Sequence, residues 1–106
     1  MSVMKIKLAV FMLVLVPLAG QVQQAQAQDN QKLLNMCIAC HGVDGSNSYG
    51  SIPNLKGQNA QYMIEQLKQF KSDQRQDKTM SKVAKLLDNE QMQLMANYFS
   101  TGKEQH

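Results

Sequence analysis

The feature that most constrains this chain is the segment Cys37-Ile38-Ala39-Cys40-His41, which contains both of its cysteines. Residues three and four apart lie on one side of a helix, so two thiols and an imidazole can face one flat object. C-x-x-C-H is the attachment signature of c-type haem. We therefore expect one covalent haem c, held by thioethers at Cys37 and Cys40, with His41 binding the iron from one face.

The N-terminus has the pattern of a cleavable export signal. Lys5 and Lys7 form a small basic region, residues 8–19 are apolar, and Ala25-Gln26-Ala27 has the small-x-small pattern that signal peptidase reads. The apolar run is shorter than the roughly 20 residues that span a bilayer. The pattern indicates export to the periplasm with no stable membrane insertion after cleavage; the alternative is an uncleaved anchor.

Cleavage after Ala27 would divide the chain into a signal peptide, residues 1–27, and a single domain, residues 28–106. Because two lysines leave with the signal, the formal net charge falls from +3 to +1. That charge gives no concentrated basic face, so we expect no nucleic-acid partner. A domain this small usually needs stabilisation beyond its own hydrophobic core, and a covalent haem would supply it. A disulfide between the cysteines is the alternative, but its short loop removes little chain entropy.

Apolar periodicity predicts an all-α domain of four helices. The first runs from about Asp29 into the motif, and its apolar stripe comprises Leu33, Met36, Cys37 and Cys40. Residues 42–57 are rich in Gly, Ser, Asn, Asp and Pro, which is typical of an irregular loop.

Two further helices and a short one follow this loop. Asn59 can cap a second helix whose apolar face carries Met63, Leu67 and Phe70. A polar loop at 72–78 precedes about two helical turns at 81–87. Asp88 and Gln91 stand in capping-box relation at the start of the last helix, and Gly102 ends it. The stripe of this last helix comprises Met92, Met95, Ala96 and Phe99.

The iron would need a second axial ligand opposite His41, and a methionine sulfur is the soft ligand that favours ferrous iron. Met36 is adjacent to Cys37 and too close to reach the far face. The methionines of the second and last helices lie on apolar faces, where core filling is the ordinary role. Met80 follows a polar stretch and can cross the far side of the haem, although it can also simply pack on the haem edge.

Several further segments resemble one family. They are Cys-Ile-Ala-Cys-His-Gly-Val-Asp-Gly at 37–45, Ile-Pro-Asn-Leu-Lys-Gly-Gln at 52–58, Tyr62 with Gln-Leu-Lys-Gln-Phe at 66–70, Arg75, Thr-Met-Ser at 79–81 and Ala-Asn-Tyr-Phe at 96–99. Together they resemble a class I cytochrome c in its small bacterial periplasmic form, and one half of the two-haem relatives.

The resemblance implies a small cytochrome c fold of about four helices wrapped around one haem. It implies thioethers at Cys37 and Cys40, with His41 and Met80 as axial ligands. It also implies that the carbonyl of Pro53 accepts a hydrogen bond from the other ring nitrogen of His41, a contact that would orient the ring and tune its basicity.

We therefore expect a soluble periplasmic electron carrier rather than an enzyme. The alternative is a haem enzyme or gas sensor, which needs a labile sixth iron position. A thiol oxidoreductase would need a βαβ pattern and a zinc site would need more convergent ligands, and neither pattern is present. Redox partners would be a quinol-oxidising complex, a terminal oxidase, or a periplasmic dehydrogenase or reductase. Five lysines form either a docking patch or an ordinary solvated surface: Lys56, Lys68, Lys71, Lys82 and Lys85.

Overall fold

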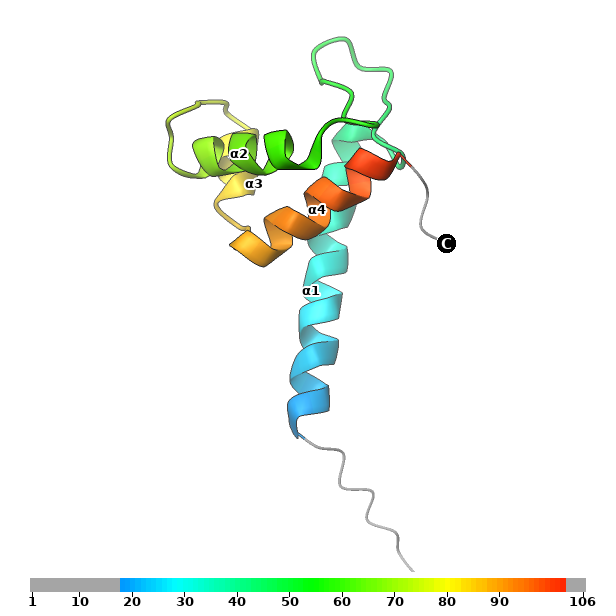
Figure 1. Cartoon of the computed structure of the whole chain (residues 1–106), viewed down its shortest axis with the longest axis vertical. Helices are drawn as coiled ribbons and strands as arrows, with labels where there is room; N and C mark the ends of the chain where they lie inside the picture. Colours follow the sequence, from blue (N-terminus) through cyan, green and yellow to red (C-terminus); the bar gives the residue numbers. More distant parts are fainter. Residues whose placement is uncertain (1–17, 103–106) are drawn as a thin grey trace, which may run out of the picture.

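The computed structural model describes residues 18–102, which contain four helices and no strand (Figure 1). The helices are α1 (Leu18–His41), α2 (Ala60–Lys71), α3 (Met80–Ala84) and α4 (Asn89–Thr101). The all-α prediction is confirmed for this part of the chain. None of these four helices is both long and apolar enough to cross a membrane. Most of the predicted signal segment, residues 1–17, lies outside the described residues.

Helix α1 begins at Leu18, well before the predicted start near Asp29. The segment between them contains many Ala and Gln residues, which favour helix. This N-terminal half projects away from the other three helices (Figure 1), and Val22 on it is 69% exposed. Contact with α4 is made at Asn30, whose Oδ1 accepts a hydrogen bond of 3.0 Å from Gln91 Nε2.

The face of α1 that packs on the core differs from the predicted stripe. Leu34, Cys37 and Ile38 pack against the core, whereas Met36 is 45% exposed and Cys40 is also exposed. Both sets fit a helical period, but they lie on neighbouring flanks of the helix. The larger side chains of Leu34 and Ile38 occupy the core, so the second cysteine lies at the margin of the buried face.

The core lies where α1 and the loop after it meet α2 and α4. Its buried cluster comprises Met63, Ile64, Ala96, Tyr98 and Phe99. The rings of Tyr98 and Phe99 meet edge to face with their centroids 4.9 Å apart. Aromatic pairs in this geometry add to stability beyond their buried area. The helices thus hold one another around a shared apolar centre.

The predicted N-terminal caps of α2 and α4, and the predicted end of α4, are confirmed. Asn59 Oδ1 accepts from the backbone N of Tyr62 at 2.9 Å, which caps α2. Asp88 and Gln91 form a reciprocal capping box at the start of α4. Gly102 ends α4 in the left-handed conformation, with φ 59°. These bonds satisfy backbone groups that the helices leave without partners.

Helix α3 is shorter than the predicted 81–87 segment and begins one residue earlier. Asp77 Oδ1 accepts from the backbone N of Thr79 at 2.9 Å and of Met80 at 2.8 Å, so the first turn starts at Met80. Beyond Ala84 the backbone N of Leu87 bonds back to the Ala84 carbonyl at 3.1 Å. Tight three-residue bonds of this type are common where an α-helix ends.

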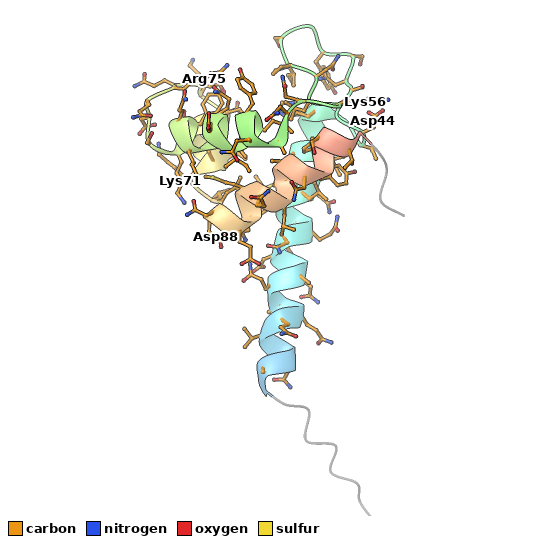
Figure 2. All side chains as sticks on the ribbon, in the orientation of Figure 1. Asp44, Lys56, Lys71, Arg75 and Asp88 are labelled. Carbon is orange, nitrogen blue, oxygen red and sulfur yellow. The ribbon has the colours of Figure 1, made fainter. Side chains whose placement is uncertain are left out.

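The loop at 42–59 folds back on itself through Gly45. The Gly45 carbonyl accepts from the backbone N of Leu55 at 2.7 Å and of Lys56 at 3.2 Å. A Cβ at Gly45 would lie 2.5 Å from the Lys56 nitrogen, so only glycine allows this approach. Lys56 Nζ also pairs with Asp44 at 3.1 Å (Figure 2). These bonds fix the return of the loop toward α2.

Candidate functional site

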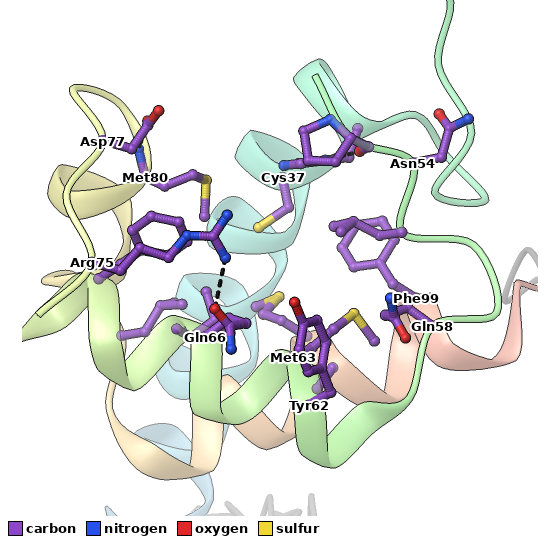
Figure 3. Close-up of a pocket in the computed structure, with 18 of the residues that line it drawn as sticks. Cys37, Asn54, Gln58, Tyr62, Met63, Gln66, Arg75, Asp77, Met80 and Phe99 are labelled. Atoms are coloured by element: carbon purple, nitrogen blue, oxygen red, sulfur yellow. Dashed lines mark hydrogen bonds between the residues drawn. The ribbon is translucent and has the colours of Figure 1, made fainter. Parts of the chain in front are cut away.

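A cavity of about 380 Å³ lies between α1, α2, α3 and α4 (Figure 3). Its lining comes from all four helices and from both long loops, and it is mainly apolar. The lining residues are Cys37, His41, Ser51, Pro53, Asn54, Leu55, Gln58, Tyr62, Met63, Gln66, Leu67, Phe70, Arg75, Asp77, Met80, Leu87, Met95, Ala96 and Phe99.

His41 is the last residue of α1 and is only 6% exposed. Its Nδ1 lies 2.8 Å from the carbonyl oxygen of Pro53. Because a carbonyl only accepts, Nδ1 carries the proton and donates, which leaves the Nε2 lone pair available for a metal. The contact with Pro53 that the family resemblance implied is thus confirmed. The hydrogen bond thus fixes the orientation and the tautomer of the ring.

The two cysteines differ in environment. Cys37 lines the cavity, with its sulfur directed into it (Figure 3), and burial raises the pKa of its thiol to about 11. Cys40 is exposed, lies one residue before His41, and is absent from the lining. One thiol is therefore inside the cavity and the other at its margin.

Met80 reaches the cavity from α3, on the side away from the C-terminal end of α1 (Figure 3). It is half-buried, and the cap from Asp77 fixes its backbone. Met63 and Met95 also line the cavity, although both are almost fully buried in the core. Met92 is fully buried and does not line it. The structure therefore brings three methionines, not one, to the cavity.

Asp77 combines a structural and an electrostatic role beside Met80. Its carboxylate accepts from the backbone N–H groups of Met80 and Thr79, which lower the pKa of Asp77. Its own backbone N donates to Ser81 Oγ at 3.0 Å, so the turn is closed from both directions. The sequence reasoning did not single out this residue, although an Asp three positions before a helical residue is a recognisable cap signal.

Arg75 is a second cavity residue whose position could not be predicted from the apolar periodicity of the helices. Its Nη1 donates to Gln66 Oε1 at 2.6 Å, and its Cζ lies 4.7 Å from the centroid of the Phe70 ring. The guanidinium therefore lies along α2 near Met80, although Arg75 is an exposed residue (Figure 3).

The five lysines that were considered as a docking patch differ in their contacts. Lys56 is paired with Asp44, and Lys85 pairs with Asp73 at 2.8 Å. Figure 2 shows Lys56 and Lys71 toward opposite ends of α2. Lys71 donates to the Leu87 carbonyl and so holds α2 against the start of α4. Two of the five lysines thus have acidic partners, and one is a structural tether.

Comparison with known proteins gives matches over nearly the whole domain. The family model described as Cytochrome c matches residues 27–103. The chain is 31% identical to cytochrome c-553 of Nitratidesulfovibrio vulgaris, over 89% of this chain and 96% of that protein. It is 32% identical to the cytochrome subunit of sulfide dehydrogenase of Chlorobaculum tepidum, over 85% of this chain and 83% of that protein.

Other relatives are longer than the chain. Cytochrome c-552 of Acidithiobacillus ferridurans is 35% identical over 80% of this chain, but the match covers only 41% of that protein. The chain thus spans less than half the length of this relative and nearly the full length of others.

Proposed function

The chain belongs to the cytochrome c family, and we propose that it is a periplasmic carrier of single electrons whose one haem c has His41 and Met80 as axial ligands. As a member of this family it is an electron-transfer haem protein with one covalent haem c. The proposed ligand set rests mainly on the hydrogen bond from His41 Nδ1 to the Pro53 carbonyl, which leaves Nε2 available to bind iron. Met80 lines the same cavity.

The residues present fit such a group. Cys37 and Cys40 of the C-x-x-C-H motif would attach it, and the second would do so from the margin of the cavity. When bound, the haem supplies a single-electron redox centre. His41 would bind iron through Nε2 while Pro53 holds its Nδ1 proton. The apolar side chains of α2 and α4 would exclude water, and a soft Met80 ligand would favour the ferrous state.

A carrier differs from a haem enzyme in its sixth iron position. With two protein ligands there is no place for substrate, and the oxidation state is all that changes. An enzyme or gas sensor would need Met80 to be absent or labile. The hydrogen bonds that the Met80 backbone N donates to Asp77 Oδ1, and that the Asp77 backbone N donates to Ser81 Oγ, support a fixed residue at this position.

We expect Asp77→Ala to loosen Met80 without removing it, because Asp77 caps the turn that carries Met80. The ferric near-infrared band of Met-to-iron charge transfer should disappear at a lower denaturant concentration than in the wild type. Asp77→Asn retains an acceptor oxygen and should behave more like the wild type. Asp44→Asn, in the distant loop, is the control; an equal effect there would show that Asp77 has no special role.

The partners that we propose are redox proteins of the periplasm. The similarity to a cytochrome subunit of sulfide dehydrogenase supports a periplasmic dehydrogenase as electron donor. A quinol-oxidising complex is the other candidate donor, and a reductase and a terminal oxidase are candidate acceptors. Stopped-flow reduction of the purified ferric protein by each candidate donor, and oxidation of the ferrous protein by each candidate acceptor, would identify the partners.

We further propose that residues 1–27 are a cleaved signal peptide and that 28–106 are the mature domain. The first contact of α1 with α4 at Asn30 lies after the proposed site, and the turns before it are largely exposed. Removing residues 1–27 should therefore leave the helical packing intact. The intact mass of the exported protein should equal the chain from Gln28 plus one haem. A mass that includes residues 1–27 would show that the segment is retained as an anchor.

A further inference from the structure

The Pro53 carbonyl that orients His41 belongs to an irregular loop. The bond from His41 Nδ1 is 2.8 Å long and joins the last residue of α1 to a residue 12 positions later. Residues 42–59 lie between α1 and α2, so neither helix holds that carbonyl in place. Pro53 cannot be fixed through a donor of its own, because proline has no backbone N–H. The position of the acceptor therefore depends on what holds the residues on either side of it.

The side chain of Asn47 reaches both neighbours of Pro53. Its Nδ2 donates to the carbonyl of Ile52 at 3.1 Å and to Oδ1 of Asn54 at 3.0 Å. The two N–H donors of a side-chain amide match these two acceptors. The backbone N of Asn47 donates to the same Asn54 oxygen at 2.9 Å. One residue thus bonds to the chain immediately before Pro53 and immediately after it.

The orientation of the Asn47 amide is fixed by a further bond. Its Oδ1 accepts from the backbone N of Tyr49 at 2.8 Å, which forms a local turn. Because a backbone N–H only donates, the amide oxygen must face Tyr49, and Nδ2 then faces Ile52 and Asn54. Asn47 is half-buried, so water competes less for these bonds than it would at an exposed position.

We propose that Asn47 is a positioning residue for His41, because its bonds to Ile52 and Asn54 hold the Pro53 carbonyl against the Nδ1 proton of the ring. The inference rests on the proposed function only in that His41 binds haem iron. Asn47 is not among the residues that line the cavity, so it acts through the loop. A carbonyl held at Nδ1 raises the basicity of Nε2, and a more basic ligand favours ferric iron.

The test uses four purified holoproteins: the wild type, Asn47→Ala, Asn47→Asp and the control Ser48→Ala. Asn47→Ala removes every bond of the side chain. Asn47→Asp keeps an acceptor for the backbone N of Tyr49 but replaces the two N–H donors by an oxygen. Ser48 is the exposed neighbour in the same loop and takes no part in this set of bonds.

Proton NMR of the ferrous protein follows the exchange of the His41 Nδ1–H with solvent. We expect this exchange to be about tenfold faster in both Asn47 variants, the change that the loss of about one hydrogen bond produces, and unchanged in Ser48→Ala. The reduction potential of Asn47→Ala should rise, because a less basic His41 stabilises ferric iron less. Asn47→Asp is assessed by exchange alone, because its new carboxylate also acts on the potential.

Exchange in both Asn47 variants that matches Ser48→Ala would overturn the inference, even if their thermal stability falls, because the role would then be merely structural. Faster exchange in Asn47→Ala alone would overturn it too, since the turn at Tyr49, and not the bonds to Ile52 and Asn54, would hold the loop. If Asn47→Ala does not fold, Asn47→Asp decides the matter by its exchange rate.

The near-infrared Met-to-iron band is recorded on the same samples in the ferric state. Its absence from the wild type would contradict Met80 as a ligand and leave the Asn47 result intact. Its presence in every protein, with no change in His41 exchange, would contradict the Asn47 inference alone.

Discussion

Met80→Ala is expected to abolish the weak near-infrared band of the ferric protein that reports a methionine sulfur on iron. The soft thioether favours Fe(II), so its loss should also lower the reduction potential. The opened position should accept water or added ligands, and the ferrous variant should bind carbon monoxide readily, whereas the wild type should bind it poorly. Absorption spectroscopy, potentiometry and carbon monoxide titration at neutral pH measure these three effects.

The other methionines provide matched controls for this result. Met92 is fully buried and does not line the cavity, so Met92→Ala should cost about 2–5 kcal/mol of stability and leave the band in place. Met63 and Met95 do line the cavity, which makes their alanine variants the sharper comparison. Loss of the band in either of them, with its retention in Met80→Ala, would transfer the ligand role to that residue. Ready binding of carbon monoxide by the wild type would count against a carrier and favour the enzyme or gas-sensor alternative.

The features that sequence reasoning predicted well are those with local causes. Asn59 and Asp88 precede apolar periodic segments, and a side-chain oxygen at that place bonds to backbone N–H groups only a few residues away. Gly102 follows the last periodic residue and takes up the left-handed conformation that other residues avoid. Such signals depend on a handful of neighbouring residues, so they can be read without knowing the tertiary structure.

The features that sequence reasoning missed depend on contacts between segments that are distant in the chain. Two apolar registers of α1 were available, and packing against α2 and α4 selected the one with Leu34 and Ile38, which leaves Met36 exposed. The position of Arg75 along α2 depends on its contacts with Gln66 and Phe70, which lie on another element. The hydrogen bond from His41 to Pro53 joins residues 12 apart, and only the family resemblance suggested it.

The second large effect concerns folding without haem. The double variant Cys37→Ala, Cys40→Ala, which lacks both thiols for attachment, is expected to be largely unfolded. Without haem, the apolar side chains that line the cavity of about 380 Å³ would be exposed to water, which costs about 25 cal/mol per Å² of apolar surface. The whole stability of a typical domain is only about 5–15 kcal/mol, so a cost of this kind is a large fraction of it. Small domains have little additional buried surface with which to offset it.

Far-ultraviolet circular dichroism and thermal melting of the double variant, beside the wild type, measure this effect. Met36→Ala is a suitable control, because Met36 lies on α1 beside the motif, is 45% exposed and does not pack in the core, so its loss should change stability little. The single variant Cys40→Ala keeps the thiol that points into the cavity and should fold with one thioether, at reduced stability. A cooperative transition with native helicity in the double variant would show that polypeptide contacts alone sustain the fold. In that case the interface between α2 and α4, with the Tyr98–Phe99 pair at its centre, would be the element that holds the protein together, and the haem would be an addition to a core already formed.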